Sequence, residues 1–328
     1  MEEAREIAKR LVAEGKGILA ADESTDSIKK KLEKVGIEDS VENHRRYRQM
    51  LFTAPEIEKY ISGVIMFDET LRQLTNDGKP FPKLLEERGI IPGIKVDEGK
   101  REMPQFPGEN ITIGLDRLPE RLDEYKALGA KFTKWRAVIN IDEDSPSDTL
   151  IHANAEMLAQ YAAIVQSRGM VPIVEPEVLM DGDNKLIASE EATDMTLRAV
   201  FMELEKHKVD YKAMLLKPNM IHQGKLSGEQ RTSQEIADVT MKVLHDNVPR
   251  EVPGIVFLSG GQSPKEAEDN LRDINKRGEA PWELSFSYGR ALQDEALQIW
   301  AGKDENIPAA QKAFLEAAKR DSMAREGK

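Results

Sequence analysis

Eight short apolar runs, many of them flanked by glycine, recur along the whole chain and are separated by longer amphipathic segments. A strand of a parallel sheet is buried on both faces by helices, so it reads as a nearly continuous apolar run. Eight such strands alternating with helices predict a closed parallel barrel. The predicted strands cover residues 17–21, 61–67, 90–94, 132–138, 171–174, 213–216, 254–258 and 282–286.

Helix-start signals lie between several of the predicted strands. Thr232 and Ser263 each stand three residues before a glutamate, which is the pattern of a capping box. Ser145 precedes a proline and predicts the N-cap of a helix that ends before Gly169.

No Pro/Gly/Ser-rich linker and no shift in composition divides the chain. We therefore expect residues 1–328 to form one α/β domain, a (β/α)8 TIM barrel with an N-terminal helix before the first strand and a helical C-terminus. A doubly wound open sheet is the alternative. It is disfavoured because no G-x-G-x-x-G follows the first strand.

Composition excludes several classes of function. The formal net charge of -12 argues against nucleic acid or a membrane surface as a partner, so an anionic ligand must bind at a local basic cluster. The absence of cysteine excludes disulfides and thiolate nucleophiles. The N-terminus is charged, and no run approaches the ~18 apolar residues of a membrane span. We expect a cytoplasmic protein.

Lys217 ends the apolar run 213–216 and is followed at once by Pro218. An ammonium that emerges from a hydrophobic strand is partly desolvated, which lowers its pKa from about 10.4 towards neutrality. A neutral lysine amine can attack a carbonyl group and form a Schiff base. The alternative is a lysine that merely ends a strand and extends its ammonium into water.

Polar residues stand at the ends of the other predicted strands as well. In a parallel barrel these carboxyl ends form one rim, where the active site lies. A desolvated lysine, nearby carboxylates and two separate basic or glycine-rich clusters predict a carbonyl substrate with a phosphate at each end. The rim residues are Asp22, Glu23, Ser24, Asp68, Glu69, Lys95, Asp97, Lys134, Arg136, Glu175, Glu177, Lys217, Ser259, Gly260, Gly261, Gly289 and Arg290.

Three of these groups have a second interpretation. Asp22 and Ser24 could simply cap the following helix. The segment 175–177 could be a solvated loop instead of an acid/base pair. The segment 259–261 could be a tight turn, although consecutive backbone N–H groups before a helix also form an anion cradle.

Seven segments of the chain together carry a resemblance to a known family. In order along nearly the whole sequence, they resemble class I fructose-1,6-bisphosphate aldolase, a lyase that forms a lysine Schiff base without a metal. The segments are 17–25 (GILAADEST), 93–97 (GIKVD), 134–136 (KWR), 172–177 (PIVEPE), 215–220 (LLKPNM), 257–262 (FLSGGQ) and 287–292 (SYGRAL).

The resemblance implies a role for five residues. Lys217 forms the Schiff base with the substrate ketone, and Glu175 is the acid/base for dehydration of the carbinolamine. Asp22 assists cleavage of the C3–C4 bond. Lys134 supports that step electrostatically, and Glu177 helps to orient the site.

The resemblance also implies two phosphate sites, a sugar-phosphate substrate and a homo-oligomer, commonly a tetramer. One phosphate is expected at Ser259, Gly260, Gly261, Gly289 and Arg290. The other is expected at Ser24, Ser27, Lys31 and Lys95, with Arg136 as a further substrate-binding residue.

The chain departs from the family pattern in four places. Asp26 replaces a usual glycine beside a proposed phosphate site, and Lys31 and His44 each replace a usual arginine. Many animal members also carry a tail that finishes in tyrosine, where the printed sequence has residues 325–328. We therefore expect the enamine to take its proton from a barrel group, such as Glu175 through a water, or from solvent.

No metal and no cofactor is expected, because the five histidines form no pair spaced four apart and no H-E-x-x-H motif. Two alternatives to the aldolase reaction stay open. One is a Schiff-base aldolase or transferase for another sugar phosphate, and the other is a catalytically inactive barrel that serves as a scaffold.

Overall fold

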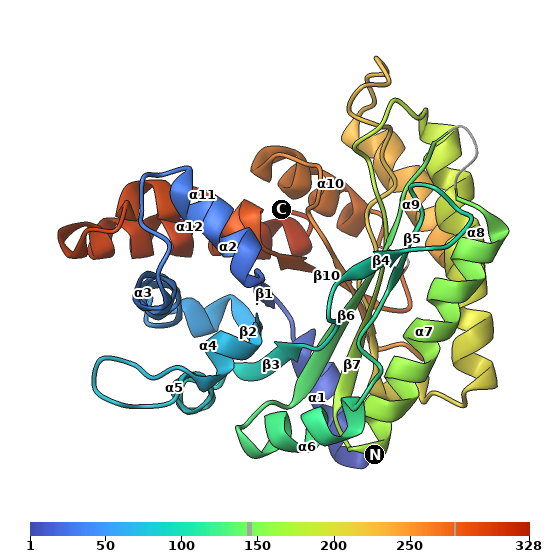
Figure 1. Ribbon diagram of the computed structural model, residues 1–328. Coiled ribbons are helices and arrows are strands. Elements are labelled where there is room, and N and C mark those ends of the chain that lie inside the picture. The colour runs from blue at the N-terminus through green and yellow to red at the C-terminus, as the bar shows by residue number, and fades with distance from the viewer. Residues whose placement is uncertain (143–145, 279) are drawn as a thin grey trace.

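The computed structural model describes residues 1–142, 146–278 and 280–328. Within these residues eight parallel strands close into a barrel with helices around it, which confirms the predicted fold (Figure 1). Neighbours around the barrel follow the order β1-β2-β3-β6-β7-β8-β9-β10, and β10 pairs with β1. The barrel strands are β1 (Gly17–Ala21), β2 (Ile61–Met66), β3 (Ile91–Lys95), β6 (Phe132–Ile139), β7 (Val171–Val178), β8 (Leu215–Leu216), β9 (Gly254–Phe257) and β10 (Glu283–Tyr288).

Helices surround the barrel, cover its amino-terminal end and make up the C-terminal region (Figure 1). Short 3-10 turns lie at Ile57–Lys59 (η1), Tyr211–Ala213 (η2) and Asp304–Asn306 (η3). The α-helices are α1 (Glu2–Leu11), α2 (Thr25–Glu33), α3 (Val41–Phe52), α4 (Asp68–Arg72), α5 (Phe81–Glu87), α6 (Leu118–Ala127), α7 (Asp148–Ser167), α8 (Leu186–Lys206), α9 (Ser233–Asn247), α10 (Pro264–Lys276), α11 (Arg290–Trp300) and α12 (Ile307–Arg325). No helix in the described part of the chain is long and apolar enough to cross a membrane.

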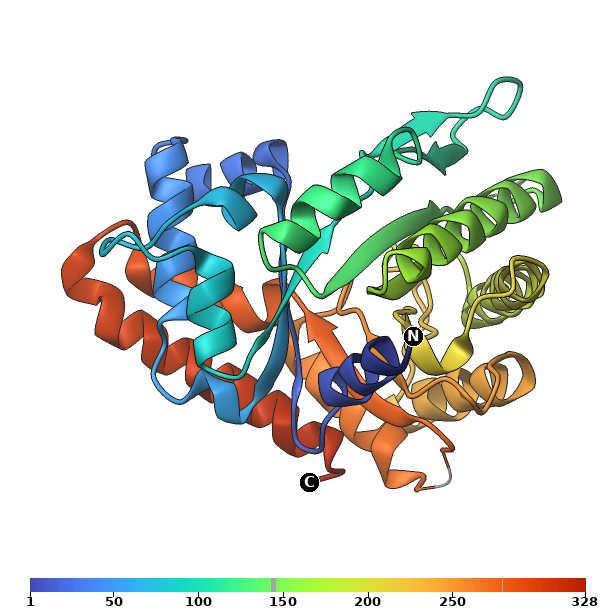
Figure 2. The same cartoon turned by 90° about the horizontal axis from the view of Figure 1, so that it is seen from below.

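The interior of the barrel is apolar near the amino-terminal ends of its strands. Ile18, Phe132, Ile173 and Leu215 belong to one buried cluster there, together with residues of α1. The Phe132 ring fills the centre so closely that a Cβ added to Gly93 would lie 2.3 Å from it. Helix α1 lies across the amino-terminal opening (Figure 2). Polar side chains of the interior are thus left to the carboxyl ends of the strands.

Strand lengths differ from the prediction. Strand β7 continues through Glu175 and Glu177, and both side chains are buried, so the solvated-loop interpretation of this segment is wrong. Strand β8 is shorter than predicted because Ala213 belongs to the 3-10 turn η2. The Lys217 N–H still donates to the Val174 carbonyl at 2.8 Å, but Pro218 has no N–H to continue the ladder.

The helix starts confirm two predictions and correct a third. Thr232 and Ser263 form the capping boxes of α9 and α10. Helix α7 begins at Asp148, and its N-cap is Ser147, whose hydroxyl accepts from the Leu150 N–H at 3.0 Å. The predicted N-cap Ser145 is therefore wrong, and Ser145 itself lies outside the described residues.

An antiparallel hairpin, β4 (Lys100–Glu102) and β5 (Asn110–Thr112), was not expected. The residues of β4 are charged and exposed, so they lack the apolar pattern that predicts a strand. The hairpin extends away from the barrel in Figure 2 and is anchored where Thr112 donates to the Arg136 carbonyl at 2.9 Å.

Helix α12 ends against the amino-terminal side of the barrel. The buried guanidinium of Arg325 donates to the carbonyls of Val12, Ala13 and Lys16 in the segment before β1, and to Glu283 at the start of β10. One side chain therefore ties α12 to both strands that close the barrel.

Candidate active site

Four predicted catalytic side chains point into the barrel because of strand alternation. Successive residues of a strand face opposite sides, so a residue two positions after an inward one is inward too. Each of the four stands two residues after a member of the inner apolar cluster: Asp22 after Ala20, Lys134 after Phe132, Glu175 after Ile173 and Lys217 after Leu215. The residues that alternate with them face outward, as Thr133 and Trp135 do where they contact Tyr161 of α7.

These four side chains form a continuous chain of ion pairs. Lys217 Nζ lies 3.1 Å from Glu175 Oε1, and Lys134 Nζ lies 3.1 Å from Glu175 Oε2. Lys134 Nζ also lies 2.7 Å from Asp22 Oδ2. Lys217, Glu175 and Lys134 are buried, whereas the Asp22 side chain is 13% exposed. Two lysines and two carboxylates thus meet at the floor of the barrel mouth.

Burial and charge act in opposite directions on these groups. Burial raises the pKa of a carboxyl group, but at Asp22 the adjacent Lys134 and Lys217 outweigh it, and the pKa is lowered. The pKa of Glu175 is lowered by the same two lysines against the same opposing burial. For Lys134 burial lowers the pKa, but Asp22 and Glu175 outweigh it, and the pKa is raised. Asp22 and Glu175 are therefore carboxylates, and Lys134 is an ammonium, in the resting protein.

Arg136 and Glu177 form a second layer beside this chain. The Arg136 guanidinium donates to Glu177, and the Arg136 backbone N–H donates to Asp97 Oδ2 at 3.3 Å. Burial lowers the pKa of Arg136, but Glu177 outweighs it, and the pKa is raised. Glu177 also approaches the loop after β9, because a Cβ on Gly260 would lie 2.7 Å from Glu177 Oε1.

The residues expected at the first phosphate lie in the loops that follow two paired strands, β9 and β10. Gly261 has a φ of +83°, and a Cβ there would lie 2.1 Å from Met180 Sδ, so the position requires glycine. Helix α10 begins shortly after this loop, and α11 begins at Arg290 with Gly289 as its N-cap. Helix N-termini favour anions. Arg290 is exposed and has no ion pair within the described residues.

The second expected phosphate cluster is only partly assembled. Ser24 is the N-cap of α2, and its Oγ lies 3.1 Å from Ser27 Oγ. Lys95 Nζ is held by Asp97 Oδ1 at 2.7 Å. Asp26 lies in the first turn of α2, where its charge suits the helix but opposes a nearby anion.

Lys31 does not join that cluster in the structure. Its ammonium contacts Glu23 Oε1 at 2.9 Å and Gln293 Oε1 at 3.1 Å, and it has no polar contact with Ser24 or Ser27 within the described residues. Burial lowers the pKa of Lys31, but Glu23 outweighs it, and the pKa is raised. The ammonium therefore belongs to an ion-pair network outside the barrel wall.

Sequence reasoning missed the rest of that network, which we call the Glu23 network: Glu23, Lys31, Tyr47, Arg48 and Gln293. Arg48 is fully buried and donates to Glu23 Oε2 at 2.7 Å. Gln293 donates to the Ala20 carbonyl at 2.7 Å and accepts from Tyr47 at 2.9 Å. The sequence predicted Glu23 as a carboxylate at the rim, but it did not predict the ion pair of Glu23 with Arg48 on α3.

The contacts of two further buried side chains, His44 and Ser287, were not predicted from the sequence. His44, which stands where the family usually has arginine, is buried between Glu69 and Asp39, with its ring nitrogens 2.9 Å from each. The Ser287 hydroxyl is buried on β10, alternates with outward-facing Phe286 and Tyr288, and has no hydrogen-bond partner within the described chain. Ser287 opens the family-like segment 287–292, but nothing else in the sequence around it predicts a buried, unpaired hydroxyl.

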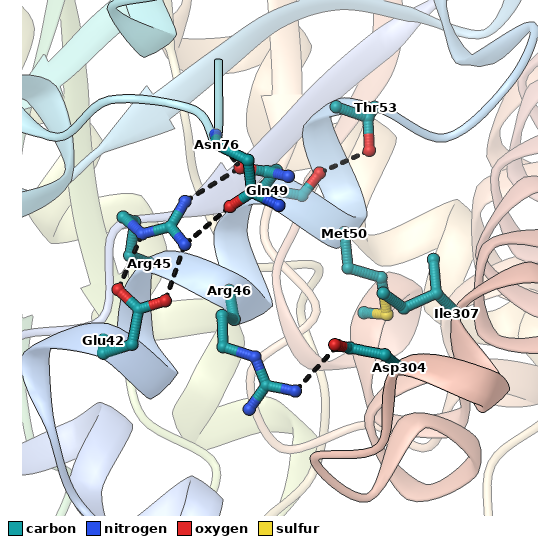
Figure 3. Close-up of a pocket in the computed structure, with 9 residues that line it drawn as sticks. All are labelled: Glu42, Arg45, Arg46, Gln49, Met50, Thr53, Asn76, Asp304 and Ile307. Atoms are coloured by element: carbon teal, nitrogen blue, oxygen red, sulfur yellow. Dashed lines mark hydrogen bonds and ion pairs between the residues drawn. The ribbon is translucent and has the colours of Figure 1, made fainter. Parts of the chain in front are cut away.

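A surface cavity of about 220 Å³ lies on the outer side of α3, away from the rim (Figure 3). Its charged walls are already paired, since Arg45 donates to Glu42 and Arg46 donates to Asp304 at 2.7 Å. The cavity therefore does not compete with the barrel mouth as the candidate site.

Comparison with known proteins agrees with this geometry. Residues 3–328 match the model of the family described as "Glycolytic: Fructose-bisphosphate aldolase class-I". The chain belongs to the class-I fructose-bisphosphate aldolase family. The resemblance seen in the sequence is thereby confirmed.

Individual relatives of this aldolase chain cover it completely. It is 50% identical over 330 residues to "Probable fructose-bisphosphate aldolase class 1" of Xanthomonas campestris pv. campestris, covering 100% of this chain and 98% of that protein. It is 51% identical over 331 residues to "Fructose-bisphosphate aldolase 1" of Caenorhabditis elegans, covering 100% and 90%.

A solved structure has the same fold. It is fructose-bisphosphate aldolase from Plasmodium falciparum in complex with TRAP and a small-molecule inhibitor. Its TM-score is 0.98 at 46% identity, with 100% of this chain and 95% of that chain covered.

Proposed function

We propose that this chain cleaves fructose 1,6-bisphosphate reversibly into dihydroxyacetone phosphate and glyceraldehyde 3-phosphate through a Schiff base on Lys217. Its membership of the class-I aldolase family supports this reaction and its lyase class. The observation that carries it is the buried Lys217 amine 3.1 Å from Glu175 Oε1 at the mouth of the barrel. No cofactor takes part.

Formation of the Schiff base needs a group that both takes and gives protons. Glu175 rests as a carboxylate, so it can take the proton of the Lys217 ammonium and free the amine for attack on the C2 ketone. It then returns protons to the C2 oxygen, which leaves as water. The balance is one ammonium and one ketone converted to one iminium and one water.

Cleavage requires a base on the far side of the substrate. Asp22 takes the proton of the C4 hydroxyl, the C3–C4 bond breaks, and its electron pair passes to the iminium to form an enamine. Lys134, held between Asp22 and Glu175, keeps both carboxylates in place and stabilises negative charge during transfer. Glu177 positions Arg136 beside the bound substrate.

The two phosphates bind at opposite sides of the mouth in this proposal. One is held by Ser259, Gly260, Gly261, Gly289 and Arg290, where two helices begin. The other is held by Ser24, Ser27 and Lys95, with Lys31 behind them. Asp22, which follows β1, lies between the two sides.

A second candidate substrate is favoured by one observation. The Lys31 ammonium is already bound by Glu23 and Gln293, and Asp26 adds a negative charge near Ser24, so the grip on the second phosphate is weakened. A ketose with a single phosphate is therefore the alternative. Comparison of kcat/KM for fructose 1,6-bisphosphate and fructose 1-phosphate decides between them, and equal values would favour the alternative.

Borohydride trapping tests the proposal itself. Incubation with substrate and borohydride is expected to inactivate the protein irreversibly and to leave an adduct that peptide mapping assigns to Lys217. An adduct on Lys134 or Lys95 would contradict the assignment. Absence of any adduct would favour a scaffold without catalysis, since a scaffold forms no reducible intermediate.

The oligomeric state, the cellular location and the single-domain organisation of the subunit also belong to the proposal. We propose a homotetramer of single-domain subunits in the cytoplasm, on the strength of the family membership. Light scattering coupled to size-exclusion chromatography measures the subunit number directly, and a monomer at micromolar concentration would reject the tetramer.

A further inference from the structure

A cluster of potential metal ligands lies away from the barrel mouth, between the neighbouring helices α7 and α8. Glu156 comes from α7, Glu203 from the last turn of α8, and His207 from the residue that caps α8. One ligand atom from each of the three lies within 4.8 Å of the other two. None of them has a role in the proposed reaction.

The spacing of these atoms fits a metal of zinc size. His207 Nε2 lies 3.1 Å from each oxygen of Glu156. Two ligands of a tetrahedral Zn²⁺ ion with bonds of ~2.0–2.2 Å are separated by about 3.3–3.6 Å. Glu203 and His207 are four residues apart, and the His207 N–H donates to the Glu203 carbonyl at 3.0 Å, so they share one helical face. A small movement of side chains is enough to close the site.

The charges of the cluster point to a cation as well. Glu203 is only 8% exposed, and a carboxyl oxygen of Glu203 lies within 4.8 Å of one of Glu156. Two carboxylates this close repel each other, and a cation between them offsets that repulsion. Lys206 Nζ lies 2.8 Å from Glu203 Oε1, but the Lys206 side chain is 58% exposed and free to turn into water. Gln160 contacts only the Oε1 atom of Glu156, at 2.8 Å.

The site is also open on one side. The side chains of His207 and Glu156 are 29% and 41% exposed. An ion can therefore enter from solvent, and a water molecule can take the fourth tetrahedral position.

We propose that Glu156, Glu203 and His207 bind one divalent transition-metal ion of the Zn²⁺ type and that this ion links α7 to α8. The ion acts on stability, because α7 covers β6 and β7 from the outside and its ligands lie outside the barrel. A pattern of two histidines spaced four apart does not find this cluster, because the two residues at that spacing are Glu203 and His207.

Zinc titration of the metal-stripped full-length protein tests the proposal. Calorimetry is expected to give one Zn²⁺ per chain, and 100-fold excess over Kd is expected to raise Tm by about 4 °C. His207→Ala is expected to weaken binding by at least about tenfold. The matched control is His152→Ala, which removes an exposed histidine on α7 that faces a single carboxylate, Asp148, at 3.5 Å. It is expected to bind as the wild type does.

A further variant, circular dichroism and anomalous scattering distinguish loss of the zinc site from loss of the fold. Glu156→Gln changes the most exposed ligand and guards against misfolding of the other variants, and circular dichroism verifies the fold of each. Anomalous scattering at the zinc edge is expected to place the ion between α7 and α8, while kcat stays unchanged with and without EDTA. No zinc binding, equal binding by His207→Ala, or an ion located elsewhere would each mean that the cluster is an ion pair only.

Discussion

Asp22 and Glu23 are neighbours in the sequence, but they belong to two different charge networks. Asp22 faces into the barrel and pairs with Lys134, whereas Glu23 faces the helices and pairs with Arg48 and Lys31. The pKa of each carboxyl is lowered against the opposing effect of burial, by Lys134 and Lys217 for Asp22 and by Arg48 and Lys31 for Glu23.

The difference lies in what the cations do. In the inner network Lys217 lies beside Glu175 at the carboxyl end of β8, where the substrate is proposed to bind. In the Glu23 network Arg48 is fully buried against Tyr47, with its ring contact at 5.4 Å, and it has no access to a ligand. Ion pairs of lysine or arginine with a carboxylate thus line the proposed active site on one side of β1 and hold the end of β1 on the other. This comparison leads to four predictions.

The largest effect is expected inside the barrel. Lys217→Met is expected to lower kcat by at least about 10⁴-fold, because the covalent step is lost, and to lower the free energy of unfolding as well, because Glu175 stays buried with one partner fewer. Steady-state cleavage kinetics and urea unfolding measure the two quantities. The control is Lys212→Met, an exposed lysine five residues earlier, which is expected to retain full activity. Activity of Lys217→Met near the wild-type level would end the assignment.

The next effect is expected in the Glu23 network. Arg48→Met leaves the Glu23 carboxylate, which is 18% exposed, with one partner fewer, and is expected to cost about 3 kcal/mol of unfolding free energy, the low end for a buried pair. Urea titration measures this loss. Arg46→Met on the same helix removes a partly exposed pair with Asp304 and is expected to cost about 1 kcal/mol or less. Equal losses in the two variants would show that burial of the network does not matter.

Arg290 tests the rim of the inner site. Arg290→Ala is expected to weaken binding of a bisphosphate by roughly 1.5–3 kcal/mol, and binding of the unphosphorylated analogue much less. Calorimetric Kd values for the two ligands measure this. Arg277→Ala, at the far end of α10 where Arg277 pairs with Asp238 at 2.6 Å, serves as the control. If both ligands lose equal affinity, Arg290 acts on the structure and not on phosphate.

The smallest effect concerns pH. A carboxyl whose folded pKa is lowered stabilises the protein above its unfolded pKa of about 4, and that stability is lost as the pH falls towards the folded pKa. Glu23→Gln is expected to reduce the slope of unfolding free energy below pH 4 by up to about 1.4 kcal/mol per pH unit. Circular dichroism during urea unfolding between pH 2 and pH 6, roughly the range of carboxyl titration, measures the slope. An unchanged slope would mean that the pKa of Glu23 is the same in the folded and the unfolded protein, which contradicts the lowered pKa.

Much of the fold could be predicted because its signal is local. All eight barrel strands have apolar runs, so their existence and order followed from the sequence alone. The end of β6 was predicted to within one residue, but that of β7 was not, because β7 continues through Glu175 and Glu177, whose charges are buried beside Lys134, Lys217 and Arg136. The hairpin at 100–112 was missed for a similar reason, since tertiary contacts and not its own pattern hold it.

The site divides in the same way. Strand alternation is enough to turn Lys134, Glu175 and Lys217 inward, and the structure brings these predicted residues within hydrogen-bonding distance. The orientation of Lys31 depends on Glu23 and on Gln293, which is 262 residues away in the sequence. No local pattern carries that information.

The pairing of β1 with β10 has a consequence for how the chain is made. A ribosome adds roughly 5–20 residues per second, and β10 begins at Glu283, so β1 waits on the order of tens of seconds for its neighbour. During that time the nascent chain exposes an unpaired edge of apolar parallel sheet, and Arg325, which fastens the seam, is synthesised later still. Translation speed and chaperone supply are therefore expected to determine the yield of folded protein more strongly than substitutions in the early helices.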